Sequence, residues 1–516
     1  MPLRRFCPAL PTYWLVALVA GAGWFPVPLG AQDDTRHGPA ASAAEEAPVA
    51  PPAAAPVPPS TQSSPATVTA PAPLDSSNRP ESPDPAAAGA PDEAAGTLLG
   101  NSEEYYKWLS LLTDAIDQID RNYVEPIDRD ELMKAAIEGV LKKLDPYSDY
   151  ISADEFDDFR VGVDSEFGGI GIQITSLNDQ LRVISPLVGT PAYRAGMMAG
   201  DRIMAIDGQL TKGMPLADAV KRMKGRAGTD LTLTVLHPHD GSSEDLKITR
   251  EVIRVDTVLG DRRNKDGSWE FMYDDTAKIG YLRLTAFSKH SDEELRAAVE
   301  SLAKRAMKGL ILDLRFNPGG LLPTAISVSD LFLSAGRIVS IKGRNVAEES
   351  WDARPEGTYA DFPMAVLVNQ YSASASEIVA ASLQDHKRAV IVGQRTWGKG
   401  SVQSVVDLKG GRSALKITTA TYFRPSGRNI HRFEGTSDGA WGVDPTEGFE
   451  VELSERETGL LVLDRRRRDV VAGKNPVEDP ATPTEFQDRQ LARALDYLRA
   501  SPASPAASPP SLDPQP

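Results

Sequence analysis

The chain has 516 residues, 41% of them hydrophobic, which is enough for two or three packed domains. Its formal net charge of −16 argues against a nucleic-acid partner, because binding to phosphate backbones requires clustered Lys and Arg. The one basic run, from Arg465 to Arg468, is flanked by aspartates and is interpreted as a solvated face or loop.

Residues 1–31 have the pattern of an export signal. A positively charged start precedes an apolar stretch from Tyr13 to Leu29, and small residues follow. We expect an exported, periplasmic protein, either soluble after cleavage behind Ala31 or tethered to the inner membrane by an uncleaved signal. The only cysteine, Cys7, lies in this segment, so a cleaved chain has no disulfide, thiolate nucleophile or cysteine-based zinc site.

Two segments are predicted to be disordered. Residues 32–97 form a tether rich in Ala and Pro, and residues 501–516 form a tail of similar composition. Such segments cannot bury enough apolar surface to offset the entropy lost on ordering.

Residues 98–160 are predicted to be an N-terminal helical region. The first helix places Tyr106, Leu109, Ile116 and Ile119 on one face, and a second helix ends before the Asp145-Pro146 turn. An apolar stripe needs a covering surface, which either the following domains or a second subunit could provide. A C-terminal helical segment, residues 471–500, leaves the same two alternatives open.

Residues 161–252 resemble a PDZ domain. Gly168, Gly169, Ile170 and Gly171 lead into an alternating strand, and a short helix and two further alternating strands follow. The resemblance implies that the N–H groups of this glycine-rich loop bind a chain-terminal carboxylate, while the strand edge pairs with the peptide. The alternative is that these glycines only make a tight turn.

Residues 253–470 alternate between strands and helices and predict a layered α/β core. One buried strand, GLILDL, ends in the turn Asn317-Pro318-Gly319-Gly320, where glycines can direct N–H groups toward a ligand. Taken alone, this sequence indicates no more than a turn.

Small residues between Ser372 and Ser376 occupy a later strand-to-helix turn, near the positive end of the helix. Lys399 lies between two glycines, and it shares one face of the following strand with Ser401 and Gln403. By pattern alone, helix-capping serines and a surface lysine are slightly favoured over catalytic groups.

Three motifs in order change that balance: LDLRFNPGGLL, VLVNQYSASASEIVAASLQD and VGQRTWGKGSVQ. With the order of helices, PDZ and core, they make the chain similar to the carboxyl-terminal processing peptidases, also called tail-specific proteases. The resemblance implies a crotonase-like α/β core and a serine endopeptidase that cleaves proteins near their carboxyl termini.

The same resemblance implies roles for individual residues. Ser374 corresponds to the nucleophile, Lys399 to its base and Gln403 to the residue that orients the lysine. The backbone N–H groups of Ala375 and Gly320 correspond to the oxyanion hole. No metal or other cofactor is implied, because the sequence lacks HExxH or similar ligand spacing.

These residue types suit the chemistry. A serine attacks only when a base within hydrogen-bond reach takes its proton. A lysine amine, with a pKa of about 10.4 in water, serves as that base only if burial lowers its pKa. Gln403 can hold the amine without adding a negative charge that would raise the pKa again.

Other hydrolase patterns are weaker. Ser437 in GTSDG and Ser413 in SALK match catalytic motifs by letters alone, without the expected flanking elements or partner motifs. The serious alternative is a non-catalytic, exported scaffold that binds peptides through its PDZ domain. Expected partners are proteins or peptides with accessible carboxyl termini, an adaptor protein, and a second copy bound through the terminal helices.

Overall fold

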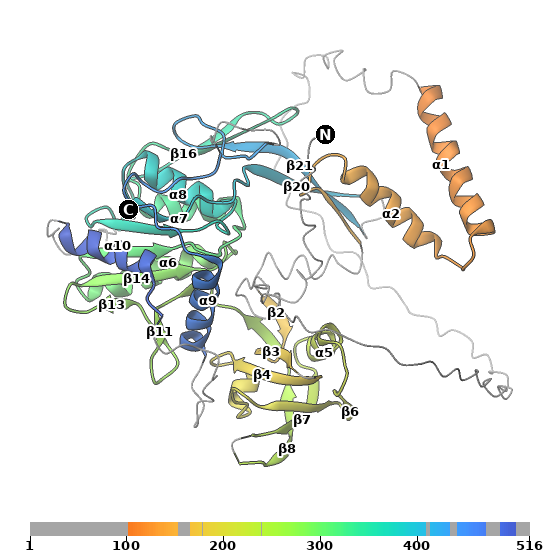
Figure 1. Cartoon of the computed structure of the whole chain (residues 1–516), viewed down its shortest axis with the longest axis horizontal. Helices are drawn as coiled ribbons and strands as arrows, with labels where there is room; N and C mark the ends of the chain where they lie inside the picture. Colours follow the sequence, from red (N-terminus) through yellow and green to blue (C-terminus); the bar gives the residue numbers. More distant parts are fainter. Residues whose placement is uncertain are drawn as a thin grey trace, which may run out of the picture. The chain divides into compact units, whose positions relative to one another are not determined.

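The computed structural model describes residues 102–152, 166–177, 179–238, 240–408, 413–433, 441–470 and 486–501 (Figure 1). The predicted signal and tether, the loop that contains Ser437 and the tail beyond Ser501 lie outside them. The described residues fall into two compact units, divided between Leu132 and Met133. Within the described ranges, no helix has the length and apolarity needed to cross a membrane.

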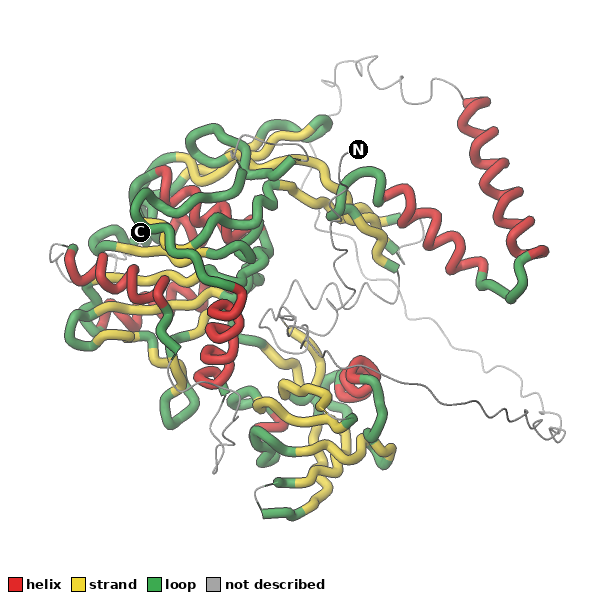
Figure 2. Tube along the Cα trace, in the orientation of Figure 1, coloured by secondary structure: helices red, strands yellow, loops and turns green. Residues whose placement is uncertain are grey.

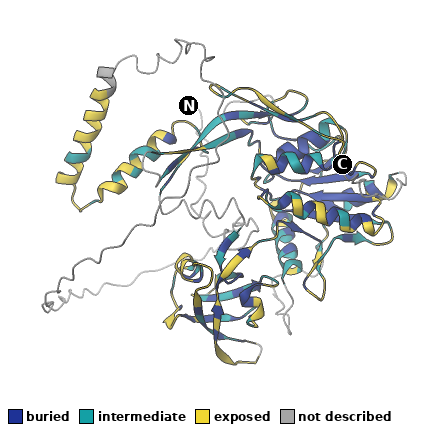
Figure 3. Cartoon of the chain, turned by 180° about the vertical axis from the view of Figure 1, so that it is seen from behind, coloured by how far each residue is buried: buried dark blue, intermediate teal, exposed yellow. Residues whose placement is uncertain are grey.

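The N-terminal helices form where the apolar periodicity predicts them. They are α1 (Ser102–Asn122) and α2 (Arg129–Leu141). Tyr106, Leu109 and Ile119 of the predicted apolar face are 67%, 43% and 40% exposed, and Figure 3 shows the exposure along this helix. The apolar stripe of α1 is therefore a large exposed surface in the single chain.

A mixed sheet forms the centre of the core, with the order β10-β14-β15-β18-β19 and with β13 also paired to β14. Its four consecutive parallel strands are almost wholly buried, as expected for a sheet covered on both faces. They are β14 (Ile279–Leu284), β15 (Gly309–Asp313), β18 (Met364–Val368) and β19 (Val390–Gly393).

Helices cover the two faces of this sheet (Figure 2). One face packs against α6 (Ser291–Lys304), α7 (Leu322–Asp330) and α8 (Ala375–Asp385). The other packs against α10 (Arg489–Ala500), whose Leu491 and Leu495 are buried with Ile311 and Leu367. The apolar face of the C-terminal helix is thus covered by its own chain.

A second, antiparallel sheet lies beside the first, with the order β1-β21-β16-β17 and with β20 also paired to β21. Its strands are β1 (Asp149–Ile151), β16 (Arg337–Gly343), β17 (Glu349–Asp352), β20 (Ser401–Asp407) and β21 (Ala414–Phe423). Because β1 follows α2 directly, this sheet joins the end of the helical region to the core.

The PDZ part has its own sheet, ordered β3-β4-β5-β7-β8, and its own apolar core. Its elements are β2 (Glu166–Gly169), β3 (Ile172–Leu177), β4 (Gln180–Pro186), α4 (Pro191–Arg194), β5 (Arg202–Ile206), β6 (Gln209–Leu210), α5 (Leu216–Met223), β7 (Asp230–Leu236), β8 (Ser243–Thr249) and β9 (Glu251–Arg254). Strand β3 is at the edge of this sheet, and the separate pair β2-β9 leads into and out of the domain.

The remaining elements belong to the core: four short strands that follow the PDZ part, and one helix near the end of the core. They are β10 (Val258–Leu259), β11 (Arg262–Arg263), β12 (Trp269–Glu270), β13 (Met272–Asp274) and α9 (Glu455–Asp469).

The interpretation of the basic run as a solvated face or loop is wrong. The run lies in α9, and Arg465 is only 7% exposed. Arg465 pairs with the buried carboxylate of Asp313, and Arg468 pairs with Asp261. Asp313 ends the buried strand β15, where an unpaired carboxylate would be costly. The guanidinium of Arg465, from a helix that is distant in sequence, is therefore buried beside it.

Candidate active site

Three turns meet at one edge of the central sheet, because β15, β18 and β19 are parallel and end there. The carbonyl of Asn317 in the first turn accepts the N–H of Ala373 at 3.0 Å and the hydroxyl of Ser376 at 2.9 Å. The N–H of Trp397 in the third turn donates to the carbonyl of Ser372 at 2.9 Å. All three sequence motifs are therefore in direct contact.

Ser374 lies at the N-cap of α8 in a strained conformation, with φ 57° and ψ −116°. A positive φ is costly for a residue with a Cβ and persists only where the surroundings enforce it. Here the N–H of Ser374 is held at 2.8 Å by Glu377, and the side chain is only 7% exposed. Strain of this kind is often found at functional sites.

The two glycines of the first turn, Gly319 and Gly320, have no room for a side chain. A Cβ on Gly319 would lie 2.8 Å from the Cβ of Ser374 and 2.9 Å from the nitrogen of Ala375. A Cβ on Gly320 would lie 2.2 Å from the carbonyl oxygen of Phe287. Ala375 is the first residue of α8, so its N–H has no acceptor within the helix. The structure thus brings the NPGG turn against the N-terminus that carries Ala375.

Tyr422 is a buried residue of β21. Burial raises the pKa of Tyr422 to about 12, and a hydrogen bond with Ser374 opposes that rise. Sequence reasoning did not select Tyr422, because β21 shows only an ordinary strand pattern.

Glu377 is a central residue that the sequence analysis missed. Its side chain is fully buried, and its Oε2 accepts the backbone N–H groups of both Ser374 and Lys399, each at 2.8 Å. Its Oε1 accepts the hydroxyl of Thr396 at 2.5 Å and the N–H of Gly398 at 2.7 Å. The Ser-x-x-Glu spacing of a helix capping box was the available signal.

Burial raises the pKa of Glu377 to about 7, and the four donated hydrogen bonds oppose that rise. One carboxyl group therefore joins the turn that carries Ser374 to the turn that carries Lys399.

Lys399 is half-buried, and burial lowers its pKa. Repulsion from Lys416 lowers the pKa further, while attraction to Glu377 and Asp145 opposes the shift. Its Nζ lies 5.1 Å from the centroid of the Tyr147 ring. This environment shifts the amine toward the neutral form that a general base requires.

Gln403 lies on β20, and its Nε2 donates to the hydroxyls of Ser401 at 2.8 Å and Thr418 at 3.3 Å. In the described part of the chain, no hydrogen bond joins the Nζ of Lys399 to Ser374 or to Gln403. The backbone positions of the predicted pair are brought together, and the roles of the two side chains stay predictions.

The predicted peptide-binding residues of the PDZ part have differing environments. Gly168 and Gly169 lie in β2 and pair with β9 instead of forming a loop, and Ile170 is buried. A Cβ on Gly168 would lie 2.1 Å from the carbonyl oxygen of Gly225, which explains why glycine is needed in a strand. Gly171, with φ 76°, makes the turn into the edge strand β3.

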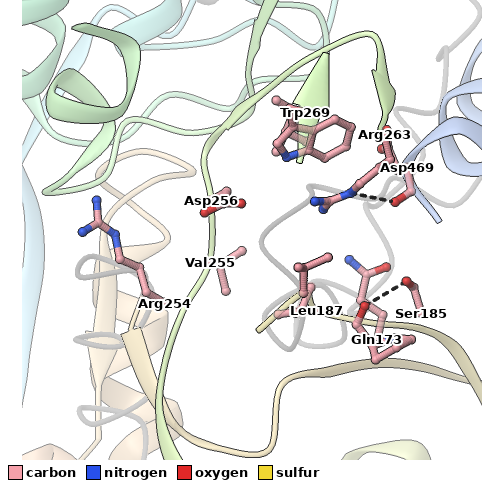
Figure 4. A pocket seen from close by; sticks show the side chains of 12 residues that line it. Gln173, Ser185, Leu187, Arg254, Val255, Asp256, Arg263, Trp269 and Asp469 are labelled. Atoms are coloured by element: carbon pink, nitrogen blue, oxygen red, sulfur yellow. Dashed lines mark hydrogen bonds between the residues drawn. The ribbon is translucent and has the colours of Figure 1, made fainter. Parts of the chain in front are cut away.

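A separate cavity of about 80 Å³ lies between strands of the PDZ part and the start of the core (Figure 4). The guanidinium of Arg263 lies over the ring of Trp269, 3.9 Å from its centroid, and donates to the carbonyl of Asp469 at 3.4 Å. Burial raises the pKa of Asp256 in the same wall. Neither Ser374 nor Lys399 lines this cavity, so it is distinct from the candidate active site.

Comparison with known proteins identifies the family. The model of peptidase family S41 matches residues 278–446, a PDZ model matches residues 162–236, and a model of the activating protease CtpB N-terminal domain matches residues 89–155. The carboxy-terminal-processing protease of Bartonella bacilliformis is 39% identical over 414 residues, which cover 79% of this chain and 92% of the relative. The chain belongs to the carboxy-terminal processing proteases of peptidase family S41.

Further relatives of this processing protease have the same description. The carboxy-terminal processing protease CtpA of Bacillus subtilis is 35% identical, over 62% of this chain and 66% of its own length. Among solved structures, the photosystem II D1 C-terminal processing protease is 29% identical, with a TM-score of 0.37 over 70% of this chain and 97% of its own. The family membership makes the chain a serine-type peptidase with a PDZ domain.

Proposed function

We propose that this processing protease is an exported endopeptidase with a Ser-Lys catalytic pair. Ser374 is the nucleophile, Lys399 is the general base, and Gln403 orients the lysine amine during the reaction. The observation that most supports the pair is that one oxygen of Glu377 accepts the N–H groups of both residues. The strained, shielded position of Ser374 and the lowered pKa of Lys399 add to this support.

The reaction proceeds by acyl transfer. The Oγ of Ser374 attacks the scissile carbonyl while its proton moves to the neutral amine of Lys399. The N–H groups of Ala375 and Gly320 stabilise the negative oxygen of the tetrahedral intermediate, and each such donor typically contributes ~100- to 1000-fold in rate. Lys399 then gives the proton to the leaving amine, and a water molecule hydrolyses the acyl-enzyme.

The proposed substrates are proteins with accessible carboxyl termini. The PDZ domain would capture or sense the tail at Gly168, Gly169, Ile170 and Gly171, with the extended tail paired to the edge of β3. The exposed stripe of α1 fits a second copy of the chain, and an adaptor protein would act as a further partner. Export to the periplasm rests on the signal pattern of residues 1–31.

The test is cleavage of an unfolded polypeptide that has an apolar carboxyl terminus. We expect the wild type to produce fragments and folded Ser374→Ala and Lys399→Ala variants to lose at least ~1000-fold in kcat. Near-normal turnover by either variant would contradict the assignment. Binding without any fragments from the wild type would instead favour a PDZ scaffold.

A further inference from the structure

Tyr147 lies in a rigid turn between α2 and β1. The Oδ1 of Asp145 accepts the N–H groups of Tyr147 at 2.7 Å and Ser148 at 2.8 Å, and its Oδ2 accepts the Ser148 hydroxyl at 2.8 Å. The Ser148 oxygen in turn accepts the N–H of Thr418 at 3.2 Å. The turn is therefore fixed to β21 of the core.

The Tyr147 ring is also held from its other sides. Its hydroxyl accepts the indole N–H of Trp397 at 3.3 Å, and the ring of His431 lies edge-on with centroids 6.2 Å apart. Trp397 comes two residues before Lys399, so the same turn supplies the lysine and a clamp on the ring.

The Tyr147 ring is a cation–π partner of the Lys399 ammonium. The Nζ of Lys399 is 5.1 Å from the ring centroid of Tyr147, within the distance of about 6 Å at which cation–π attraction acts. No hydrogen bond or ion pair of the Lys399 ammonium occurs among the described residues.

The attraction depends on charge, because the face of an aromatic ring attracts an ammonium and not a neutral amine. Ser374, in contrast, needs the neutral amine. We propose that Tyr147 is a positioning residue that holds the Lys399 ammonium away from Ser374 and releases the side chain when it loses its proton. This inference rests on the proposed Ser-Lys mechanism and adds a resting position to it.

Other charged and titratable groups face the same lysine. Lys416 of β21 repels the ammonium, while Glu377 of α8 and Asp145 of the turn attract it. Burial lowers the pKa of His431, which contacts the Tyr147 ring, so this imidazole favours its neutral form. Substitution of Tyr147 leaves all of these groups in place, which isolates the contribution of the ring.

The sign of the effect follows from the charge. The ring stabilises the protonated lysine, so its removal should lower the pKa of Lys399 and move the acid limb of kcat/KM to lower pH. The expected shift for Tyr147→Leu is roughly half a pH unit. Tyr147→Phe keeps the ring and should keep the wild-type midpoint, while Tyr147→Trp should move it upward.

The experiment measures the titration midpoint of Lys399 in two ways. Competitive acetylation, followed by peptide mass spectrometry, reports the pKa of Lys399 in the full-length protein without any turnover. The pH profile of kcat/KM, measured on an unfolded polypeptide, reports the same group through activity. Should Tyr147→Leu fail to fold, Tyr147→Trp gives the same test with the opposite sign.

An unchanged or raised acetylation midpoint in Tyr147→Leu would overturn the inference, as would an equal shift in Tyr147→Phe. If Tyr147→Leu is unfolded, an unchanged or lowered midpoint in Tyr147→Trp would overturn it. Failure of the proposed function is recognised separately, because the wild type would then show no cleavage that depends on Ser374, whatever the acetylation midpoints are.

Discussion

Glu377 contributes to the candidate site through the backbone and not through the reacting atoms. Its two oxygens accept four donors, two of which are the N–H groups of Ser374 and Lys399. A buried group with this many partners is costly to alter, because each donor left unpaired loses its compensation for burial. Glu377 is therefore expected to influence both stability and turnover.

We predict that Glu377→Gln destabilises the fold by about 2–4 kcal/mol and lowers kcat by ~100-fold. The amide nitrogen would face two donors, which would displace the turns of Ser374 and Lys399. Urea unfolding and peptide cleavage measure the two effects. Glu455→Gln, at an exposed position of α9, is the matched control, and equal behaviour of the two variants would refute the role given to Glu377.

The pKa of Glu377 adds a signature in pH. Burial raises this pKa to about 7 in the folded chain, so the folded state binds the proton more tightly than the unfolded state does. The contribution of this group to stability is then fully present below its unfolded pKa and is lost as pH rises through about 7. The stability gap between wild type and Glu377→Gln should shrink from about pH 5 to about pH 8.

At the scale of elements, a buried ion-pair network ties the C-terminal helix to the active-site edge. Arg315, in the turn after β15, pairs with Asp313 at 2.7 Å and with Asp488, the N-cap of α10, at 2.8 Å. Burial alone would raise the pKa of Asp488, but the charge of Arg315 holds it below its usual value. Helix α10 thus fixes the arginine two residues before Asn317.

We expect Asp488→Asn to cost about 1–3 kcal/mol, because Arg315 loses one charged partner while the helix keeps a good N-cap residue. Thermal and urea unfolding at neutral pH measure the loss. Asp496→Asn, at an exposed position of the same helix, should leave stability within about 0.5 kcal/mol of wild type. A loss no larger than that in Asp488→Asn would show that the network does not stabilise the fold.

The elements of the core could be predicted because their signals are local. The predicted buried strand GLILDL coincides with β15, and the predicted strand-to-helix turn from Ser372 to Ser376 lies where β18 ends and α8 begins. The burial of Arg465 could not be predicted, because its partner Asp313 is 152 residues away in sequence. The contact of Tyr147 with Lys399 was missed for the same reason, since no periodicity reports such a pairing.

For the candidate site, too, the local features could be predicted from the sequence and the contacts between distant segments could not. Pattern placed Ser374, Lys399 and Gly320 in turns, and family resemblance supplied their roles. That the three turns lie at one sheet edge follows from the parallel order of β15, β18 and β19, which only the structure establishes. The surroundings of the Lys399 side chain depend on Tyr147, in the turn before β1, and on Lys416 of β21, both of which lie outside the turn of Lys399 in the sequence.

At the scale of the whole molecule, the proposal links tail binding in the PDZ domain to cleavage in the core. We predict that a substrate with a free carboxyl terminus is cleaved faster than the same substrate with a carboxyl-terminal amide, because the amide lacks the charge that backbone N–H groups bind. Deletion of residues 161–252 should abolish this difference. Circular dichroism and the melting temperature of the remaining core control for misfolding.

An unchanged preference for the free carboxylate in the folded deletion variant would contradict tail capture by the PDZ domain. It would leave the Ser-Lys chemistry untouched, because those residues lie entirely in the core.

The most direct test of the account is to locate the acyl group on the enzyme. A reactive peptide ester is mixed with the full-length protein at neutral pH, the reaction is quenched with acid, and the modified residue is mapped by peptide mass spectrometry. The account predicts an acyl group on Ser374 in the wild type and its near-complete loss in Lys399→Ala. Acylation of another residue, or wild-type acylation of Ser374 without Lys399, would contradict it.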